Sequence, residues 1–289
     1  MAKQEQPKQP KAGKGAGAKL DLATLLGLVV AMGGIIGGLL LDGGKITDIS
    51  QFTAAMIVLG GTAGAVMVST PLKVLKGGMG RLVSVFRDAA PRLDELIEEV
   101  IGYATNARKN GLVSLEQQAL KIQDPFLRKA LTLAVDGTDL QEIRRMLELE
   151  IGLEEQHAEA EAKVFECAGG YAPTVGIIGA VMGLIQVMKN LANIDEVGHG
   201  IAVSFVATVY GVGTANLFFL PAAAKIKARA HAETQRKELI LEGVSGIVEG
   251  MNPKLIRAKL EAYAGAPPNK KSKKGKETEG AEAAASAPA

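Results

Sequence analysis

The chain has 289 residues, 47% of them hydrophobic and 22% charged. With 33 Lys plus Arg against 31 Asp plus Glu, its net charge of +2 excludes a nucleic-acid-binding protein that depends on bulk positive charge. One cysteine excludes a disulfide framework and a cysteine-based zinc site, and three scattered histidines indicate no metal site.

Four blocks of the chain contain no Asp, Glu, Lys or Arg, and they hold most of its hydrophobic residues. The blocks are 22–41, 49–72, 167–188 and 200–224. Each reaches the roughly 20 residues that a transmembrane helix needs. Because the first 19 residues are polar and Lys-rich, we expect the first block to be an uncleaved span rather than a signal peptide. The sequence therefore predicts four transmembrane helices.

Basic residues are distributed unevenly around these spans. Segment 1–19 has five Lys, segment 73–166 has thirteen Lys plus Arg, and the part after residue 224 has thirteen more, whereas the connectors 42–48 and 189–199 have one each. By the positive-inside rule, both termini and the central segment are cytoplasmic. We expect two helical hairpins with almost nothing exposed outside, which excludes a receptor with an external ligand domain.

The spans contain no ionisable group that could carry an ion at the bilayer midplane. They are rich in glycine pairs spaced four apart, a spacing that allows helices to approach closely. The pairs are Gly33 with Gly37, Gly34 with Gly38, Gly60 with Gly64, and Gly179 with Gly183. Packing within the chain and packing between subunits both remain open. Pro173 and Pro221 each remove a helix hydrogen bond, so each predicts a static kink or a hinge.

The central segment predicts a series of cytoplasmic helices. A helix is expected over 92–107, a break at Asn110–Gly111, a short helix over 112–122, and a third helix from Pro125. Asp139, followed by Glu142, resembles a capping box. From there one helix can run unbroken into the third span.

The helix that enters the third span is acidic, and the helix that leaves the fourth span is at first basic. The acidic residues are Glu148, Glu150, Glu154, Glu155, Glu159, Glu161 and Glu166, and the basic ones are Lys225, Lys227, Arg229, Arg236 and Lys237. We expect the two extensions to pair as a stalk rather than to form two independent solvated faces. Residues 266–289 lack an apolar period and are predicted to be disordered. Their lysine run, Lys270 to Lys276, is expected to be solvated, with contact to anionic membrane lipid as the alternative.

Two stretches of the second hairpin carry a family resemblance. The sequences APTVGIIGAVMGLI (172–185) and IAVSFVATVYGVGTANLFFLPAAAKIK (201–227) resemble the third and fourth spans of the flagellar stator (MotA) group of the MotA/TolQ/ExbB proton channel family. The resemblance covers roughly residues 20–262. TolQ and ExbB place one span before the large cytoplasmic segment, whereas this chain places two, which favours the stator group.

The resemblance implies a homo-oligomeric, pentameric ring around a MotB-type partner that supplies the membrane aspartate. Thr208 matches a hydroxyl that faces this acid, and Pro173 and Pro221 match the functional prolines of the family. In the motif ARKNGLVSLE, Arg108 and Glu116 match residues that contact the rotor protein FliG.

The residue at one position of the third span bears on the choice of ion. Ala180 stands where sodium-driven relatives carry a threonine. Threonine would add an oxygen ligand for a hard cation, and alanine cannot. The predicted ion is therefore a proton rather than sodium.

We therefore predict an all-α polytopic protein of the bacterial inner membrane that converts ion flow into torque. No residue pattern indicates an enzyme, a cofactor or a metal site. The predicted segments are a polar N-terminus (1–19), a first hairpin (20–72), a rotor-facing helical domain (73–166), a second hairpin (167–224), a cytoplasmic helix (225–265) and a tail (266–289). The alternatives are a TolQ/ExbB-like energising channel for another envelope system and a non-conducting membrane scaffold.

Overall fold

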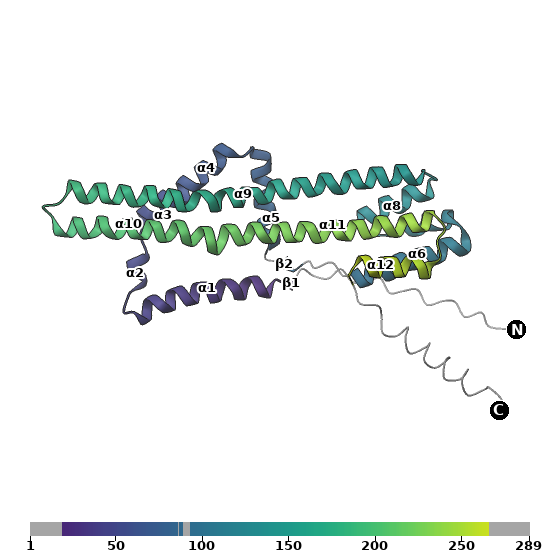
Figure 1. Cartoon of the computed structure of the whole chain (residues 1–289), viewed down its shortest axis with the longest axis horizontal. Coiled ribbons are helices and arrows are strands. Elements are labelled where there is room, and N and C mark those ends of the chain that lie inside the picture. Colours follow the sequence, from purple (N-terminus) through teal and green to yellow (C-terminus); the bar gives the residue numbers. More distant parts are fainter. Residues whose placement is uncertain (1–18, 86, 89–92, 266–289) are drawn as a thin grey trace, which may run out of the picture. The chain divides into compact units, whose positions relative to one another are not determined.

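The computed structural model describes residues 19–85, 87–88 and 93–265, and nearly all of them are helical (Figure 1). The exception is a two-residue antiparallel pair, in which β1 (Lys19–Leu20) lies beside β2 (Arg87–Asp88). The predicted all-α class is confirmed. The predicted polar N-terminus up to residue 18 and the predicted disordered tail lie outside the described residues.

The described residues pack into two compact units. The first is built from parts of 1–89 and 158–227, and the second from parts of 90–157 and 228–289. Two long helices, α9 (Leu140–Lys189) and α11 (Leu220–Val248), contribute to both units. The predicted rotor-facing segment 73–166 therefore does not coincide with one unit, because residues at both of its ends pack with the membrane hairpins.

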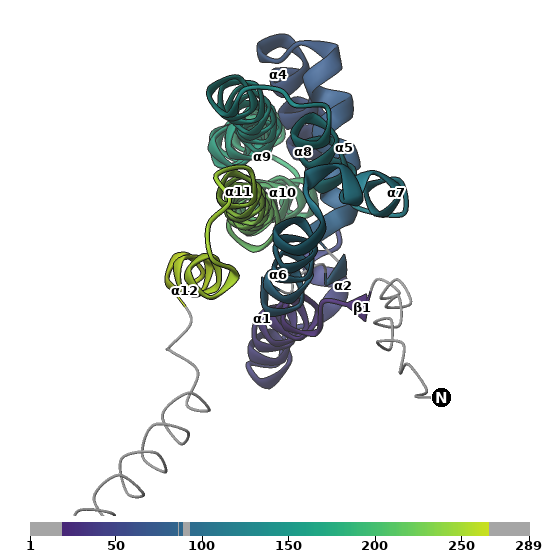
Figure 2. The same cartoon turned by 90° about the vertical axis from the view of Figure 1, so that its right-hand side faces the viewer.

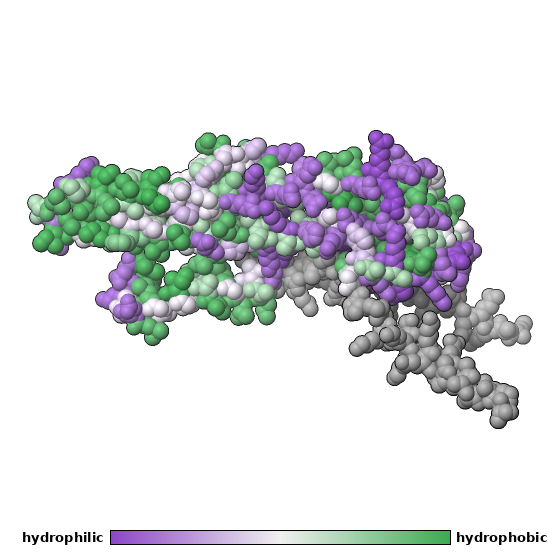
Figure 3. Space-filling model, in the orientation of Figure 1, coloured by the Kyte–Doolittle hydropathy of each residue, from purple (hydrophilic) through white to green (hydrophobic). Residues whose placement is uncertain are grey.

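Four helical segments among the described residues are long and apolar enough to cross a membrane. They are α1 (Leu22–Leu41), the composite segment Ile46–Ser69, the apolar part of α9, and α10 (Ile194–Thr214) with its continuation. Figure 3 shows hydrophobic surface over α1 and over the hairpin of α9 and α10. The four predicted spans are confirmed as helical segments.

The second span differs from the uniform helix predicted over 49–72. It consists of α2 (Ile46–Ile49), α3 (Phe52–Ala55), a π-helical turn η1 (Met56–Gly60) and α4 (Gly61–Ser69). The chain is extended at Gln51, between α2 and α3. It leaves the helix again at Thr70, because the residue before Pro71 is driven to extended dihedral angles.

A short amphipathic helix follows the first hairpin. It is α5 (Leu72–Val85), and it packs on α9 through its glycines. A Cβ atom on Gly78 would lie 3.1 Å from the carbonyl oxygen of Glu161, so a larger residue would fit only if α5 and α9 moved slightly apart. Arg81 of α5 forms an ion pair with Glu161 at the same place. The glycines of α5 thus let it lie directly against the acidic helix.

The second unit begins with the helices that the sequence predicts. They are α6 (Leu93–Asn110), the 3-10 turn η2 (Leu112–Leu115), α7 (Glu116–Ala119) and α8 (Pro125–Val135). Gly111 makes the predicted break with a φ of +83°, and Gly137 makes the predicted turn with a φ of +75°. The predicted helix over 112–122 is shorter, since only 116–119 is α-helical.

One hydrophobic core holds the second unit together. The predicted apolar face of α8 is buried in it, with Leu127, Ala130 and Leu131 fully inaccessible to solvent. The last helix, α12 (Pro253–Tyr263), adds Ile256 and Leu260 to the same core. The core therefore joins residues that are more than 100 positions apart in the sequence.

Ion pairs link α9 and α11, as the predicted stalk requires. Lys237 pairs with Glu154 in the second unit, and Lys227 pairs with Glu166 in the first, with Nζ 2.7 Å from Oε1. In one pair the charges are exchanged between the helices: the basic residue, Arg144, lies on α9, and it donates to the acidic Glu242 of α11 at 3.0 and 3.4 Å. The prediction of complementary charge is confirmed, although the acidic and basic faces are not strictly separate.

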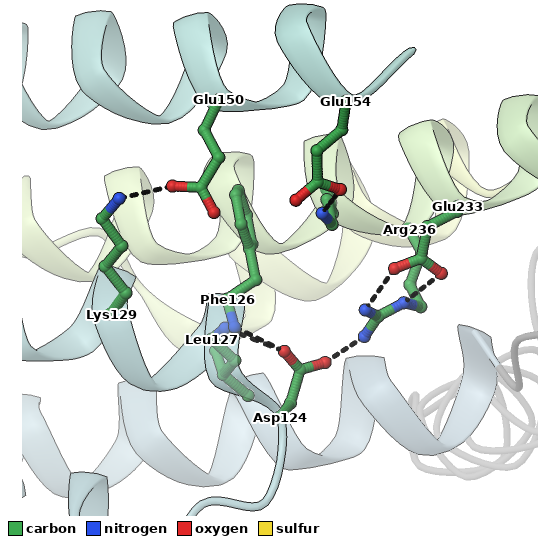
Figure 4. A network of polar contacts seen from close by, with 9 residues as sticks. Asp124, Phe126, Leu127, Lys129, Glu150, Glu154, Glu233 and Arg236 are labelled. Atoms are coloured by element: carbon green, nitrogen blue, oxygen red, sulfur yellow. Dashed lines mark hydrogen bonds and ion pairs between the residues drawn. The ribbon is translucent and has the colours of Figure 1, made fainter. Parts of the chain in front are cut away.

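A polar network surrounds the start of α8 in the second unit (Figure 4). Asp124 caps α8 by accepting from the backbone N–H groups of Phe126 and Leu127, at 2.9 and 3.1 Å. Its second oxygen pairs with Arg236, which also donates to Glu233. Burial alone would raise the pKa of Asp124, but hydrogen bonds from Arg236 and Leu127 lower it below its usual range. Asp124 thereby joins a helix start to α11.

Candidate functional site

In the first unit, α9 and α10 approach each other closely at their glycines. A Cβ on Gly176 would lie 2.9 Å from the carbonyl oxygen of Ala207 and 3.5 Å from the Cα of Thr208. A Cβ on Gly211 would lie 2.6 Å from the carbonyl oxygen of Ala172 and 3.2 Å from the Cα of Pro173. We call this line of small residues the α9–α10 seam. Figure 2 shows the two helices next to each other, nearly end on.

The α9–α10 seam shows which glycine pairs pack within the chain and which are left for packing between subunits. Gly179 and Gly183 of the third span face Ala207 and Ser204 of α10, so they pack within the chain. Gly33, Gly34, Gly37 and Gly38 of α1 have open space where a Cβ would stand. No residue of α1 is buried. Packing within the chain therefore explains the glycines of the third span but not those of the first.

Ser204 is the polar centre of the seam. Its hydroxyl lies 2.9 Å from the carbonyl oxygen of Ala180 and 2.8 Å from that of Gly200. The side chain is buried, and both carbonyl oxygens lie within hydrogen-bond distance of its single hydroxyl donor. Ser204 thus joins the third span to the fourth at the position that bears on the choice of ion.

Thr208 lies one helical turn after Ser204 and is half-buried. Its hydroxyl donates to the carbonyl oxygen of Ser204 at 3.2 Å. The hydroxyl oxygen keeps lone pairs that can accept a hydrogen bond from a protonated acid. The structure therefore brings Ala180, Ser204 and Thr208 together along the α9–α10 seam, and the Thr208 hydroxyl oxygen can accept a hydrogen bond there.

Pro173 and Pro221, the two prolines predicted to kink or hinge their helices, both lie near the contact between Gly169 and Leu220 in the first unit. Pro173 is inside α9 and has no N–H to donate to the carbonyl of Gly169. A Cβ on Gly169 would lie 2.6 Å from Cδ2 of Leu220, the residue before Pro221. A π-helical turn, η3 (Ala215–Phe219), ends directly before this point. Irregular helix geometry and both prolines therefore meet where α9 passes α11.

Pro221 also borders a cavity of about 310 Å³. Ala23, Gly27 and Ala31 of α1 line one side, and Leu217, Phe218 and Pro221 line another. The cavity leaves room beside the proline turn for a change in its bend.

The start of α1 is tied to α11 one turn after Pro221. Lys225 forms an ion pair with Asp21, which caps α1, and it also bonds the hydroxyl of Thr24. The hydrogen bond from Lys225, followed by that from the backbone of Thr24, lowers the pKa of Asp21 to about 2. The carboxylate therefore stays ionised across the physiological range.

Arg108 and Glu116 lie in the second unit, on either side of the Gly111 break. Arg108 is in the last turn of α6 and Glu116 begins α7, and both side chains are exposed. Neither forms an ion pair within the part of the chain that the structure describes. They are available to a partner surface. Over the same residues, no group of His, Cys, Asp and Glu could hold a metal ion.

Sequence reasoning did not single out Ser204, Tyr210 or Lys225 as site residues. Tyr210 joins the fourth span to the second, because its hydroxyl donates to the carbonyl of Ile49 and accepts from the N–H of Gln51. A lone tyrosine in an uncharged span is a usable signal, since a buried hydroxyl needs a partner in the membrane. Nothing in the local sequence indicates the partner of Lys225.

Comparison with known proteins agrees with this geometry. Residues 118–239 match the model of the MotA/TolQ/ExbB proton channel family, and residues 25–109 match that of the motility protein A N-terminal region.

Three relatives are similar over most of their length. Motility protein A of Helicobacter pylori (strain ATCC 700392 / 26695) is 36% identical, over 84% of this chain and 95% of the relative. The structure of C. jejuni MotAB superposes with a TM-score of 0.81 at 34% identity, covering 84% of this chain and 96% of that one. The flagellar MotAB stator complex from Bacillus subtilis superposes with a TM-score of 0.79 at 34% identity, covering 85% and 96%. The chain therefore belongs to the MotA/TolQ/ExbB proton channel family, within its motility protein A group.

Proposed function

We propose that this chain is the stator subunit of a flagellar motor and forms an ion channel with a MotB-type partner. The observation that carries the proposal is a close-packed seam with hydroxyl groups, between spans whose apolar blocks (22–41, 49–72, 167–188 and 200–224) contain no Asp, Glu, Lys or Arg. An ion carrier must therefore come from another chain. The similar MotAB stator complexes pair a chain of this fold with such a partner.

The proposed path runs along the second hairpin, with Thr208 facing the acid of the partner. When that acid takes up a proton, the Thr208 hydroxyl oxygen can accept its hydrogen bond. Ala180 offers no side-chain oxygen where a threonine would supply a further ligand for a hard cation, which supports a proton as the transported ion.

Pro173 and Pro221 are proposed to pass motion from the path to the cytoplasm. Three features support this role: each proline lacks a helix hydrogen bond, a π-helical turn precedes Pro221, and a cavity borders Pro221. Arg108 and Glu116 are proposed to transmit that motion to the rotor protein FliG, since both are exposed charges without a partner among the described residues.

The proposed assembly is a pentameric ring in the bacterial inner membrane, with both termini in the cytoplasm. The large hydrophobic side chains exposed on the spans, including Ile177, Phe205 and Val209, need lipid or another subunit to cover them. We propose no catalytic activity for the chain.

A reconstitution experiment tests the proposal. The chain is placed in liposomes with its MotB-type partner, from which the segment that plugs the channel is removed, and proton flux is measured with an internal pH dye. We expect a proton leak that disappears when the partner aspartate is changed to Asn. No flux from any such complex would contradict the channel and favour a passive scaffold.

The choice between a motor and a TolQ/ExbB-like energising channel depends on which partner activates flux. Two membrane segments before the cytoplasmic domain, α1 and Ile46–Ser69, support the motor. Flux with a TolR- or ExbD-type partner and none with a MotB-type partner would reverse this assignment.

A further inference from the structure

The cavity of about 310 Å³ beside Pro221 has three walls, all in the first unit. Its size is at the lower end of the range for ligand pockets. The walls come from α1, from α5 and from the turn before Pro221, and they include Gly27 and Ala31, Leu82, and Leu217 with Phe218. An empty space of this kind costs its lining residues their dispersion contacts, so a matching occupant is favourable.

The polar groups that line the cavity already have partners in the protein. Lys225 forms an ion pair with Asp21 and bonds the hydroxyl of Thr24. The side-chain nitrogen of Asn216 donates to the carbonyl oxygen of Val212, in its own helix, at 2.9 Å. The other described residues that line the cavity are apolar or glycine. Because a buried water needs several polar partners, and apolar cavities take up apolar molecules instead, the cavity suits an apolar occupant.

The cavity starts at a membrane boundary and extends into the hydrocarbon. Lys225 directly follows the uncharged block 200–224, and Asp21 directly precedes the block 22–41. The lining residues Lys225 and Asn216 are nine positions apart, which is about 13 Å at ~1.5 Å per residue. Half of the hydrocarbon core of a bilayer is about 15 Å thick. The depth of the cavity therefore matches the acyl chain of a lipid in one leaflet.

The rim of the cavity is accessible to lipid and carries a cation. Leu28 and Phe218, which line the cavity, are also exposed, and no residue of α1 is buried. The ammonium group of Lys225 has three N–H donors, of which Asp21 and Thr24 take two. The third has no partner in the part of the chain that the structure describes. It can donate to a phosphate oxygen at the level of the lipid headgroups.

We propose that an acyl chain of a phospholipid from the cytoplasmic leaflet fills this cavity, with the lipid phosphate bound by Lys225. The lipid would then form part of the wall beside Pro221 and α1. The site depends on the cavity and on Lys225 alone, so the inference goes beyond the proposed function and holds whether or not the chain conducts ions.

Photolabelling tests the acyl chain. The full chain with its MotB-type partner is placed in nanodiscs of phosphatidylethanolamine and phosphatidylglycerol, with a phospholipid that carries a diazirine on one acyl chain. After illumination, labelled residues are identified by mass spectrometry. We expect label on Leu217 in the cavity as well as on Leu26, an exposed residue of α1 outside it. Label on Leu26 without label on Leu217 would mean that another subunit closes the cavity, which overturns the inference.

A variant that fills the cavity sharpens this test. Gly27→Leu should reduce the label on Leu217 about tenfold or more, because the new side chain and an acyl chain cannot share the space. No atom lies within 4 Å of the place where a Cβ on Gly27 would stand, so the backbone accommodates the change. The matched control is Gly33→Leu, which adds the same bulk to α1 at a glycine with equally open space outside the cavity. Ala31→Leu, from the same wall as Gly27, replaces Gly27→Leu if that variant fails to assemble. Equal label in the cavity-filling variant and the wild type would refute the inference.

Native mass spectrometry tests the phosphate contact. The wild-type complex should retain a phospholipid through detergent washing, whereas retention of only a fatty acid or detergent would contradict the inference. Lys225→Gln should weaken phospholipid retention about fivefold, the effect of one exposed charge contact. Asp21→Asn is the control, because it breaks the same ion pair but keeps the cation, and it should retain the lipid. Equal loss in both variants would show that the pair only holds α1 in place and that Lys225 binds no phosphate.

Discussion

Single polar residues connect distant parts of the chain at several places. Asp124, Tyr210 and Lys225 each contact a segment more than 100 positions away. In each case the polar group meets its partner at a helix end or a helix break, where backbone groups lack partners within the helix. These residues are the points at which a single substitution has a local and measurable effect.

Asp124→Ala should loosen α8. The substitution removes a cap that accepts from two backbone N–H groups and an ion-pair partner of Arg236. Loss of a cap costs about 1 kcal/mol, and up to about 2 kcal/mol in some proteins. Hydrogen exchange of the Phe126 and Leu127 amides should therefore be faster by about 5- to 30-fold. Asp124→Asn is the control, because it can still cap the helix and should show a smaller change.

The same carboxylate predicts a pH dependence. Burial would raise the pKa of Asp124, but the bonds from Arg236 and Leu127 outweigh it and lower the pKa in the folded state. A lowered pKa means that the stabilising contribution is complete above about pH 4, the pKa of an unfolded Asp, and is lost as the pH falls through the folded value. The protection of the α8 amides, measured relative to their intrinsic exchange rate at each pH, should fall in that acid range in the wild type. If Asp124→Ala shows the same fall in protection, Asp124 is not its cause.

Tyr210→Phe should destabilise the break in the second span. The change removes the hydroxyl that joins Ile49 and Gln51, and leaves a carbonyl and an N–H with one partner fewer. We expect faster hydrogen exchange at Gln51 and intact assembly. Tyr171→Phe is the matched control, since the Tyr171 hydroxyl has no hydrogen-bond partner among the described residues. Equal exchange in the two variants would show that Tyr210 does not hold the break.

At the scale of elements, the proline turns of α9 and α11 are the least regular parts of the long helices. Pro173 lies within one turn of the contact between Gly169 and Leu220, and Pro221 follows the π-helical turn η3. Such irregularities often mark functional sites in helices.

Pro173→Ala and Pro221→Ala should each leave assembly intact and abolish rotation. Alanine restores an N–H that can close the helix hydrogen bond, which straightens the helix and stiffens the turn. Assembly is followed by purification with the partner, and rotation by tethered-cell assays. Pro125→Ala is the control, because Pro125 lies at the first position of α8, where no helix hydrogen bond is missing. Normal swimming in both variants would mean that the prolines form static kinks.

At the scale of the whole molecule, the four apolar spans belong to the first unit, and the exposed residues that the family resemblance assigns to the rotor contact belong to the second. The spans expose large apolar side chains that require lipid or further subunits, whereas the second unit exposes Arg108, Glu116 and Lys254. A membrane channel joined to a charged contact surface is the arrangement that a torque-generating subunit needs. How the surfaces act together depends on the partner that brings the acid.

Ion flow through the complex should follow the proton gradient. The third span has alanine at position 180, which offers no side-chain oxygen to a sodium ion. Swimming speed should persist when sodium is removed and the proton gradient is held, and it should fall when the proton gradient is collapsed in the presence of sodium. Motility that stops on sodium removal alone would refute the proton assignment.

The sequence by itself determined the four spans, the Gly111 break, the buried face of α8 and the pairing of the α9 and α11 charges. These features depend on local quantities: the length of an uncharged run, the period of apolar residues, and the sign of charge along a helix. The predicted roles of Pro173, Ala180, Thr208, Pro221, Arg108 and Glu116 came from the family resemblance and stay predictions.

Only the tertiary structure decided where the second span breaks and which residues of α6 and α12 line one surface cleft. The Tyr210 hydroxyl bonds the chain near Ile49, and Arg108 and Lys254 line the same cleft, over separations that no local pattern encodes. Such contacts are set by the packing of whole helices. A glycine pair looks the same in the sequence whether it packs inside the chain, as at Gly183, or stands open, as at Gly37.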